Sequence, residues 1–225
     1  MEDIVLVTLK LFSYSLQITL SMAIQWVVMI IIAFLVLKFG SNLKKFPDRR
    51  QGIAELFVDT IDNLVKANMG EQYREFIPFF GTLALYMILL NFVGLFGITP
   101  PTTNYSVTLG LGLVSFLVIQ GYTIKKIGLV HYFLGYTKPI IVLLPINILE
   151  RIAFPISLSL RLFGNMFAAT MIMDLIYKGL GSISPFATIG IPIFFHGYFD
   201  LFDGTLQMVI FVMLTMINIK IISEH

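Results

Sequence analysis

The chain has 225 residues, of which 57% are hydrophobic and 12% are charged. Soluble domains carry about 25% charged residues, so this composition excludes an ordinary soluble globule and favours a polytopic membrane protein of one domain. The 15 basic and 13 acidic residues nearly balance and no cysteine is present, which gives no basis for nucleic-acid binding and excludes disulfides and thiolate metal sites.

Residues 11–37 contain no charged side chain. They predict the first transmembrane helix, because about 20 apolar residues cross a hydrocarbon core of about 30 Å. The acidic residues Glu2 and Asp3 before this run, together with its length, argue against a cleavable signal peptide. We therefore expect the N-terminal region to stay on the protein.

Residues 50–75 predict an amphipathic helix on the cytoplasmic side of the membrane. Glu55, Asp59 and Asp62 are four and three residues apart, so they share one face, and apolar residues occupy another. Such a helix is typical of the interface between membrane and water. The pattern fits an interfacial connector, and it also fits a docking surface for a peripheral partner.

Residues 76–124 form a second charge-free run, long enough for two crossings. Pro100 and Pro101 interrupt it, and proline ends a helix because it lacks the backbone N–H group. We expect a helical hairpin with helices at 76–97 and 105–124.

The last third of the chain predicts two long helices, 139–177 and 185–223. A helix over the first of these ranges would be about 58 Å long at 1.5 Å per residue, nearly twice the thickness of the hydrocarbon core. Both are therefore expected to be steeply tilted as a hairpin, or kinked at Pro145, Pro155 and Pro192. The predicted fold is an all-α polytopic membrane protein: five transmembrane helices, one interfacial amphipathic helix and one membrane domain over residues 1–225.

Lysine and arginine counts predict the orientation, because cytoplasmic loops carry an excess of both. The segment after the first helix holds Lys38, Lys44, Lys45, Arg49 and Arg50, and the loop after the hairpin holds Lys125, Lys126 and Lys138. The opposite side offers Lys10 and Lys178. We expect the N-terminus outside and the C-terminus in the cytoplasm.

Both long helices carry polar residues at helical spacing. On the final helix four of them share one face of a regular α-helix: His196, Asp200, Asp203 and Gln207. This stripe stops part-way through the membrane, as expected of a half-channel that is wet from one side. On the preceding helix four others cluster on one side: Asn147, Glu150, Arg161 and Asn165. Thr170 and Asp174 lie roughly opposite.

Arg161 lies more than a dozen residues from either end of its predicted helix, so its side chain reaches the headgroups only with difficulty. A guanidinium stays protonated, and at the bilayer centre it costs about 2.5–3.5 kcal/mol on insertion scales. It must face water or a carboxylate. Glu150 is about 16 Å away along the helix, so a partner from another subunit is the alternative. For Asp174, Glu150 and His196 a structural role remains an equal alternative.

The segment Pro155-Ile-Ser-Leu-Ser-Leu-Arg161-Leu-Phe-Gly-Asn165-Met resembles the signature of subunit a of F-type rotary ATP synthases. The stretch from Pro101 to Thr108 and the pair Leu206-Gln207 extend the resemblance to essentially the whole chain. It implies a stator subunit that is not an enzyme on its own and needs no cofactor or metal. Its implied partners are the c-subunit ring, the b-subunit peripheral stalk, other ATP synthase subunits and the lipid bilayer. We expect a bacterial plasma membrane.

The resemblance also implies a mechanism, in which ions enter one half-channel, ride on a carboxylate of the c-ring and leave by the other. Arg161 matches the essential arginine between the two paths, Asn165 the polar residue one turn later, and Gln207 the glutamine that faces it. Thr170 and Asp200 depart from the residues that relatives carry at those positions.

These departures shape the expected ion path. We expect Asp174, Asp200 and Asp203 to line the outer half-channel. Relatives often carry glutamate where Asn147 stands, and Glu150 is expected to substitute for it. Na⁺ stands as the alternative to H⁺. A secondary transporter, which predicts inverted repeats that the sequence lacks, and a purely structural scaffold are the competing functional classes.

Overall fold

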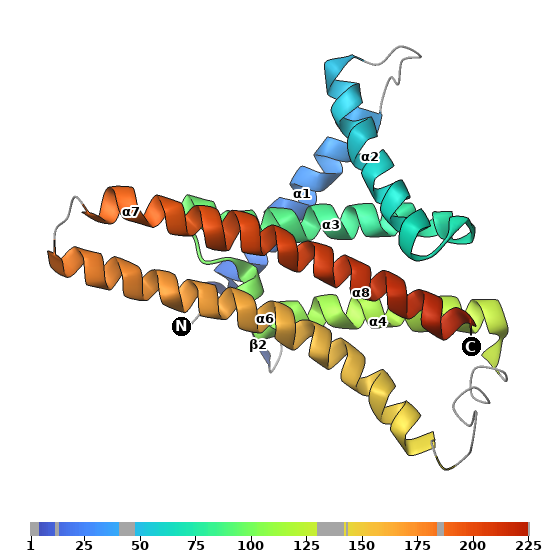
Figure 1. Cartoon of the computed structure of the whole chain (residues 1–225). Coiled ribbons are helices and arrows are strands. Elements are labelled where there is room, and N and C mark those ends of the chain that lie inside the picture. The colour runs from blue at the N-terminus through green and yellow to red at the C-terminus, as the bar shows by residue number, and fades with distance from the viewer. Residues whose placement is uncertain are drawn as a thin grey trace.

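The computed structural model describes residues 5–11, 14–40, 48–129, 142, 144–183 and 187–224. Within this part, five helical segments are long and apolar enough to cross a membrane, as predicted: Leu20–Gly40, Glu71–Phe96, Tyr105–Ile127, Leu144–Ser182 and Gly190–Ser223. The prediction of an all-α polytopic membrane protein is therefore confirmed, with one addition at the N-terminus. Figure 1 shows the helices as an elongated bundle from which α2 and the adjoining end of α1 project.

The N-terminal segment differs from the prediction of a helix over 11–37. Strands β1 (Val5–Leu11) and β2 (Tyr14–Thr19) pair as an antiparallel hairpin, so helix α1 (Leu20–Gly40) begins nine residues later than expected. The absence of charged residues could not distinguish a strand from a helix in this segment, because both lie within the same charge-free run. Polar and apolar residues alternate from Tyr14 to Thr19, and this period of two is typical of a strand.

Helix α2 (Arg49–Asn68) is the amphipathic helix, and it ends earlier than the predicted residue 75. Gly70, at φ +107°, breaks it, and the 3-10 helix η1 (Glu71–Phe76) follows. Ile61, Val65 and Met69 are buried at intervals of four residues, so one face of the second half of α2 packs on the bundle. Ile53 and Leu56 in the first half stay exposed.

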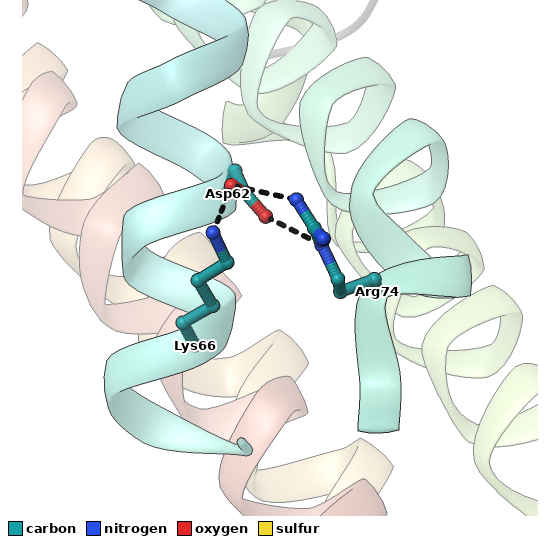
Figure 2. A network of polar contacts seen from close by, with 3 residues as sticks. All are labelled: Asp62, Lys66 and Arg74. Carbon is teal, nitrogen blue, oxygen red and sulfur yellow. Dashed lines mark hydrogen bonds and ion pairs between the residues drawn. The ribbon is translucent and has the colours of Figure 1, made fainter. Parts of the chain in front are cut away.

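Asp62 ties α2 to η1. Its carboxylate lies 2.6 Å from Lys66 Nζ on the same helix and accepts a hydrogen bond from Arg74 Nε at 3.3 Å (Figure 2). The hydrogen bond from Lys66 lowers the pKa of the Asp62 carboxyl group below its usual value, and Arg74 lowers it further, while partial desolvation opposes both. The chain therefore turns between α2 and η1 around a carboxylate that is held ionised.

Helices α3 (Ile77–Phe92) and α4 (Tyr105–Ile127) form the predicted hairpin. Between them lie two short 3-10 helices, η2 (Val93–Phe96) and η3 (Pro101–Thr103). Asn104 caps α4, because its side-chain oxygen accepts a hydrogen bond from the backbone N–H of Ser106 at 3.0 Å. The largest buried side chains of α3, Phe80 and Met87, belong to the core shared with α4, α6 and α8.

Helix α6 (Leu144–Ile183) runs unbroken for 40 residues, about 60 Å at 1.5 Å per residue. It continues through Pro155, and Pro192 lies inside helix α7 (Ala187–His196), so neither proline ends a helix. The predicted start of this segment at 139, and residues 185 and 186 of the next one, lie outside the described residues. At the contact with α4, a β-carbon on Gly112 would lie 2.7 Å from the Pro155 carbonyl oxygen, so the two helices touch at their backbones.

The final helix is interrupted. Helix α7 passes into a π-helical segment, η5 (Gly197–Asp203), and then into α8 (Gly204–Glu224). In Figure 1 α6 and this run lie along each other and slant across α3 and α4. The prediction of two long, tilted helices in a hairpin agrees with this arrangement.

Hydrogen bonds fix which segments share each end of the bundle. At one end Tyr73 OH lies 2.7 Å from Ser223 Oγ, and Lys126 Nζ donates to the same phenol oxygen at 3.2 Å. At the other end Asn91 Nδ2 donates to the Gly204 carbonyl oxygen at 2.9 Å. The C-terminal residues of α4 and α8 therefore lie together with η1, whereas the C-terminal end of α6 and the N-terminal end of α7 lie toward the opposite end.

Candidate ion path through the last two helices

Arg161 lies near the middle of α6 and is exposed on the surface of the chain. It makes no hydrogen bond or ion pair with another residue in the described part of the chain. Together with the buried Gln207 of α8 it lines a small crevice, whose other walls are apolar: Leu158, Leu162, Ile210 and Phe211. The arginine and the glutamine are thus brought together from helices that the sequence separates by more than forty residues.

The surface around Arg161 is open and has small side chains. Ser157, Gly164 and Ala168 are exposed at intervals that place them beside Arg161 on one face of α6. A β-carbon on Gly164 would have no atom of this chain within 4 Å. Asn165, one turn after Arg161, is exposed on the same face. Small residues let a neighbouring membrane helix approach closely.

Asp200 is 6% exposed, and it is the one carboxylate, ammonium or guanidinium group that is buried in the described residues. Its Oδ2 atom lies 2.6 Å from His196 Nδ1, one turn earlier. On the other side the carboxyl group packs directly on Gly94 of η2. A buried charge in a membrane protein marks a functional path more often than a structural contact, because it is costly to bury.

The π-helical segment changes the expected geometry of the polar stripe. The prediction placed four residues on one face of a regular α-helix: His196, Asp200, Asp203 and Gln207. The assumption of a regular α-helix is wrong for residues 197–203, which are π-helical. A π-helix has more residues per turn than an α-helix, so residues before and after it shift in phase. The structure joins His196 to Asp200, whereas Asp203 is only partly buried and contacts neither through a hydrogen bond.

Asn91 holds the end of the π-helical segment. Its Nδ2 atom donates to the Gly204 carbonyl oxygen at 2.9 Å, and its Oδ1 atom accepts from Thr102 Oγ1 at 3.1 Å. Asn91 and Thr102 are fully buried. This pair of hydrogen bonds joins α3, η3 and α8 at Gly204, four residues after Asp200.

Thr170, Asp174 and Glu150 form no hydrogen bond with this cluster. Thr170 Oγ1 donates to the Met166 carbonyl oxygen of its own helix at 2.9 Å. Asp174 is half-buried and Glu150 is exposed, and neither forms an ion pair with any residue for which the structure gives a position. Asn147 lies one turn before Glu150 and is half-buried.

Three residues of the site were missed by the sequence analysis. Tyr177 OH lies 2.9 Å from His196 Nε2, and it continues the stripe of Thr170 and Asp174 at the next helical interval, so periodicity could have found it. Gly94 and Asn91 lie more than a hundred residues before their partners, and no local spacing points to such contacts.

Comparison with known proteins places the chain in a family. The family model described as ATP synthase A chain matches residues 22–220. The chain is 31% identical over 223 residues to the protein named "ATP synthase subunit a, sodium ion specific" from Propionigenium modestum, with 92% of this chain and 75% of that protein covered. It is 33% identical to ATP synthase subunit a of Trichlorobacter lovleyi, over 87% of this chain and 83% of that protein.

A third relative, ATP synthase subunit a of Moorella thermoacetica, is 29% identical over 84% of each chain. The match to the family model includes Arg161, Gln207 and the buried Asp200. The chain therefore belongs to the ATP synthase subunit a family, and it is a multi-pass, ion-translocating subunit of the membrane sector, which works with other ATP synthase subunits and is not an enzyme on its own.

Proposed function

We propose that this chain is the stator that passes H⁺ through two offset half-channels to and from a carboxylate on a c-subunit ring, with Arg161 between the two paths. The observation that carries this proposal is the exposed guanidinium near the middle of α6, which has no ion pair within the described chain. A permanent cation at this depth needs a counter-charge. A c-subunit carboxylate that arrives at the open face supplies it.

Arg161 has two electrostatic effects in this mechanism. It favours the ionised form of each arriving carboxylate, which releases the bound ion, because an opposite charge nearby stabilises the charged form. It also excludes cations from passing directly between the half-channels. Each ion that crosses the membrane yields about 2.3 kcal/mol per 100 mV, so the ring must sum several ions for one ATP.

The outer half-channel is proposed to contain Asp200, Asp203 and Asp174, and the inner one Glu150 and Asn147. Gln207 lies at the level of Arg161, and Asp200 precedes it by seven residues, toward the N-terminal end of α7. The lysines of α4 lie at the opposite end. By the excess of positive charge in cytoplasmic loops, that end is proposed to face the cytoplasm, with the N-terminus outside and the protein in a bacterial plasma membrane.

The remaining assignments follow from the family. We propose that residues 1–225 form one membrane domain and that the b-subunit peripheral stalk holds it beside the ring. Na⁺ is the second candidate ion, and the observation that favours it is the relative whose name specifies sodium. ATP synthesis driven by an imposed Na⁺ gradient, with a protonophore present to collapse the pH gradient, distinguishes the two ions.

The central test replaces Arg161 with Ala in the complete enzyme, reconstituted in vesicles. We expect loss of ion-driven ATP synthesis while the complex still assembles. Lys178→Ala removes an exposed cation from the same helix and serves as the control, which should leave synthesis unchanged. Unaltered coupling in Arg161→Ala would refute the proposal and leave a structural scaffold as the alternative. Unchanged synthesis in the Asp200→Asn, Asp203→Asn double variant would refute the outer half-channel.

A further inference from the structure

Three side chains, one each from α6, α7 and η5, form a hydrogen-bonded chain at the end of the bundle where α6 ends and α7 begins. Tyr177 OH lies 2.9 Å from His196 Nε2, and His196 Nδ1 lies 2.6 Å from Asp200 Oδ2. The rings of Tyr177 and His196 also contact each other, with centroids 5.9 Å apart. The two interactions between these residues together fix the position of the imidazole.

Exposure falls along this chain from the surface to the interior. Tyr177 is 41% exposed, the His196 side chain 21% and Asp200 6%. Tyr177 lies about 24 Å from Arg161 along α6, whereas Asp200 lies about 10 Å from Gln207 along α8, at 1.5 Å per residue. The chain therefore leads from the outer end of the hairpin toward the level of the arginine.

The chemistry of the three groups assigns a direction to the hydrogen bonds. An ionised carboxylate only accepts hydrogen bonds. A neutral imidazole that donates to it from Nδ1 has its acceptor lone pair on Nε2, and a phenol hydroxyl donates to that atom. The ionised carboxylate thus selects the tautomer of His196 that turns an N–H group toward it, and the tyrosine hydroxyl holds the imidazole in place by donating to Nε2.

We propose that Tyr177 is a positioning residue of the outer half-channel, which holds the imidazole of His196 in the position that keeps the buried carboxyl group of Asp200 oriented in the ion path. This inference rests on the proposed function, because it takes Asp200 as a member of that path. Gly94 packs against the carboxyl group without a side chain of its own, and among the described residues it is His196 that hydrogen-bonds to the carboxyl group and so fixes its orientation. Without the tyrosine hydroxyl, the Nε2 atom loses its hydrogen bond and the imidazole is held less firmly against Asp200.

The test measures passive ion flow through vesicles that contain the membrane sector without its catalytic head, so ATP chemistry does not contribute. Tyr177→Phe removes only the hydroxyl group and should lower the flow about five-fold, the effect of one hydrogen bond. Tyr198→Phe is the matched control, because Tyr198 is exposed on η5 and stacks on Phe202 at 5.8 Å without a hydrogen bond in the described residues. It should conduct like the wild type.

A second pair of variants separates positioning from a structural role. Tyr177→Phe should have no further effect when His196 is already Ala, because the hydroxyl acts through the imidazole. Equal losses in both backgrounds, or normal flow in Tyr177→Phe, would overturn the inference. The Asp200→Asn variant identifies which idea has failed. Normal flow there overturns the outer half-channel and this inference with it, whereas lost flow there with normal flow in Tyr177→Phe overturns the role of Tyr177 alone.

Discussion

Gly94 and Asp200 approach each other so closely that a β-carbon at position 94 would lie 2.6 Å from the carboxyl carbon of Asp200. The glycine lies in the turn after α3, and the aspartate lies in the π-helical segment of the last membrane-spanning run. The absence of a side chain on one helix therefore makes room for the buried carboxylate on the other. This contact leads to the first prediction.

Gly94→Ala should displace the Asp200 side chain or separate the two helices. Overpacking of this kind costs about 1–3 kcal/mol, so the assembled membrane sector should unfold at a lower temperature and conduct fewer ions. Adding Asp200→Ala removes the colliding atoms and should restore thermal stability without restoring ion flow. Gly110→Ala is the control, because a β-carbon there meets no atom within 4 Å. Equal stability of Gly94→Ala and the wild type would contradict this account.

Gly164→Leu tests whether the open face beside Arg161 is covered by a partner. A β-carbon at position 164 meets no atom of the described residues within 4 Å, so we expect the subunit to fold and insert normally. A helix of the c-ring could no longer approach, and ATP synthesis and ring rotation should fall by at least about ten-fold, equivalent to about 1.4 kcal/mol. Gly121→Leu adds the same bulk to an exposed site on α4 and should be neutral. Normal coupling in Gly164→Leu would show that nothing packs there.

Asn91→Leu keeps the size of the side chain but leaves the buried Thr102 hydroxyl without its acceptor. An unsatisfied buried polar group costs about 1–3 kcal/mol, which should appear as a lower melting temperature of the purified complex. Thr102→Val in the same chain removes that hydroxyl and should recover part of the loss. If the two changes simply add, Asn91 and Thr102 are not energetically coupled.

The anchor of α2 should weaken in acid. The pKa of Asp62 is lowered first by Lys66 and then by Arg74, so its contribution to stability is present above the usual carboxyl pKa and is lost as the pH falls through the lowered value. A nitroxide label on Ala67→Cys, in a chain that has no native cysteine, should become more mobile in acid. Asp62→Asn should show that mobility already at neutral pH. A label whose mobility does not depend on pH in either chain would contradict the prediction.

Hydropathy predicted the five membrane spans because each needs about 20 apolar residues, a signal that survives errors at the ends. It could not place the start of α1, since a charge-free strand and a charge-free helix look alike until the alternation from Tyr14 to Thr19 is considered. The end of α2 was missed for a similar reason: the pattern continued, but Gly70 adopts a backbone conformation that ends the helix.

The candidate site was predicted in part. Arg161 followed from the cost of a permanent charge far from the ends of its helix, and Asp200 from its spacing to Gln207. The π-helix over 197–203 could not be predicted from a regular period, and Asp203 forms no hydrogen bond with His196 or Asp200, which bond to each other. Gly94 and Asn91 entered the site through tertiary packing alone, whereas Tyr177 lay on a stripe that could have been continued.

The hydrogen bond between Tyr73 and Ser223 joins residues that are 150 positions apart, and Tyr73 is fully buried. During synthesis the helix after Tyr73 enters the membrane long before Ser223 exists. The phenol group of Tyr73 has two partners among the described residues, Ser223 and Lys126. Until the last helix is made, Lys126 is the one of the two that can bond to it. The packing at this end of the bundle is thus completed by the last turn of α8. A nascent subunit that stalls before this turn lacks the hydrogen bond between Tyr73 and Ser223.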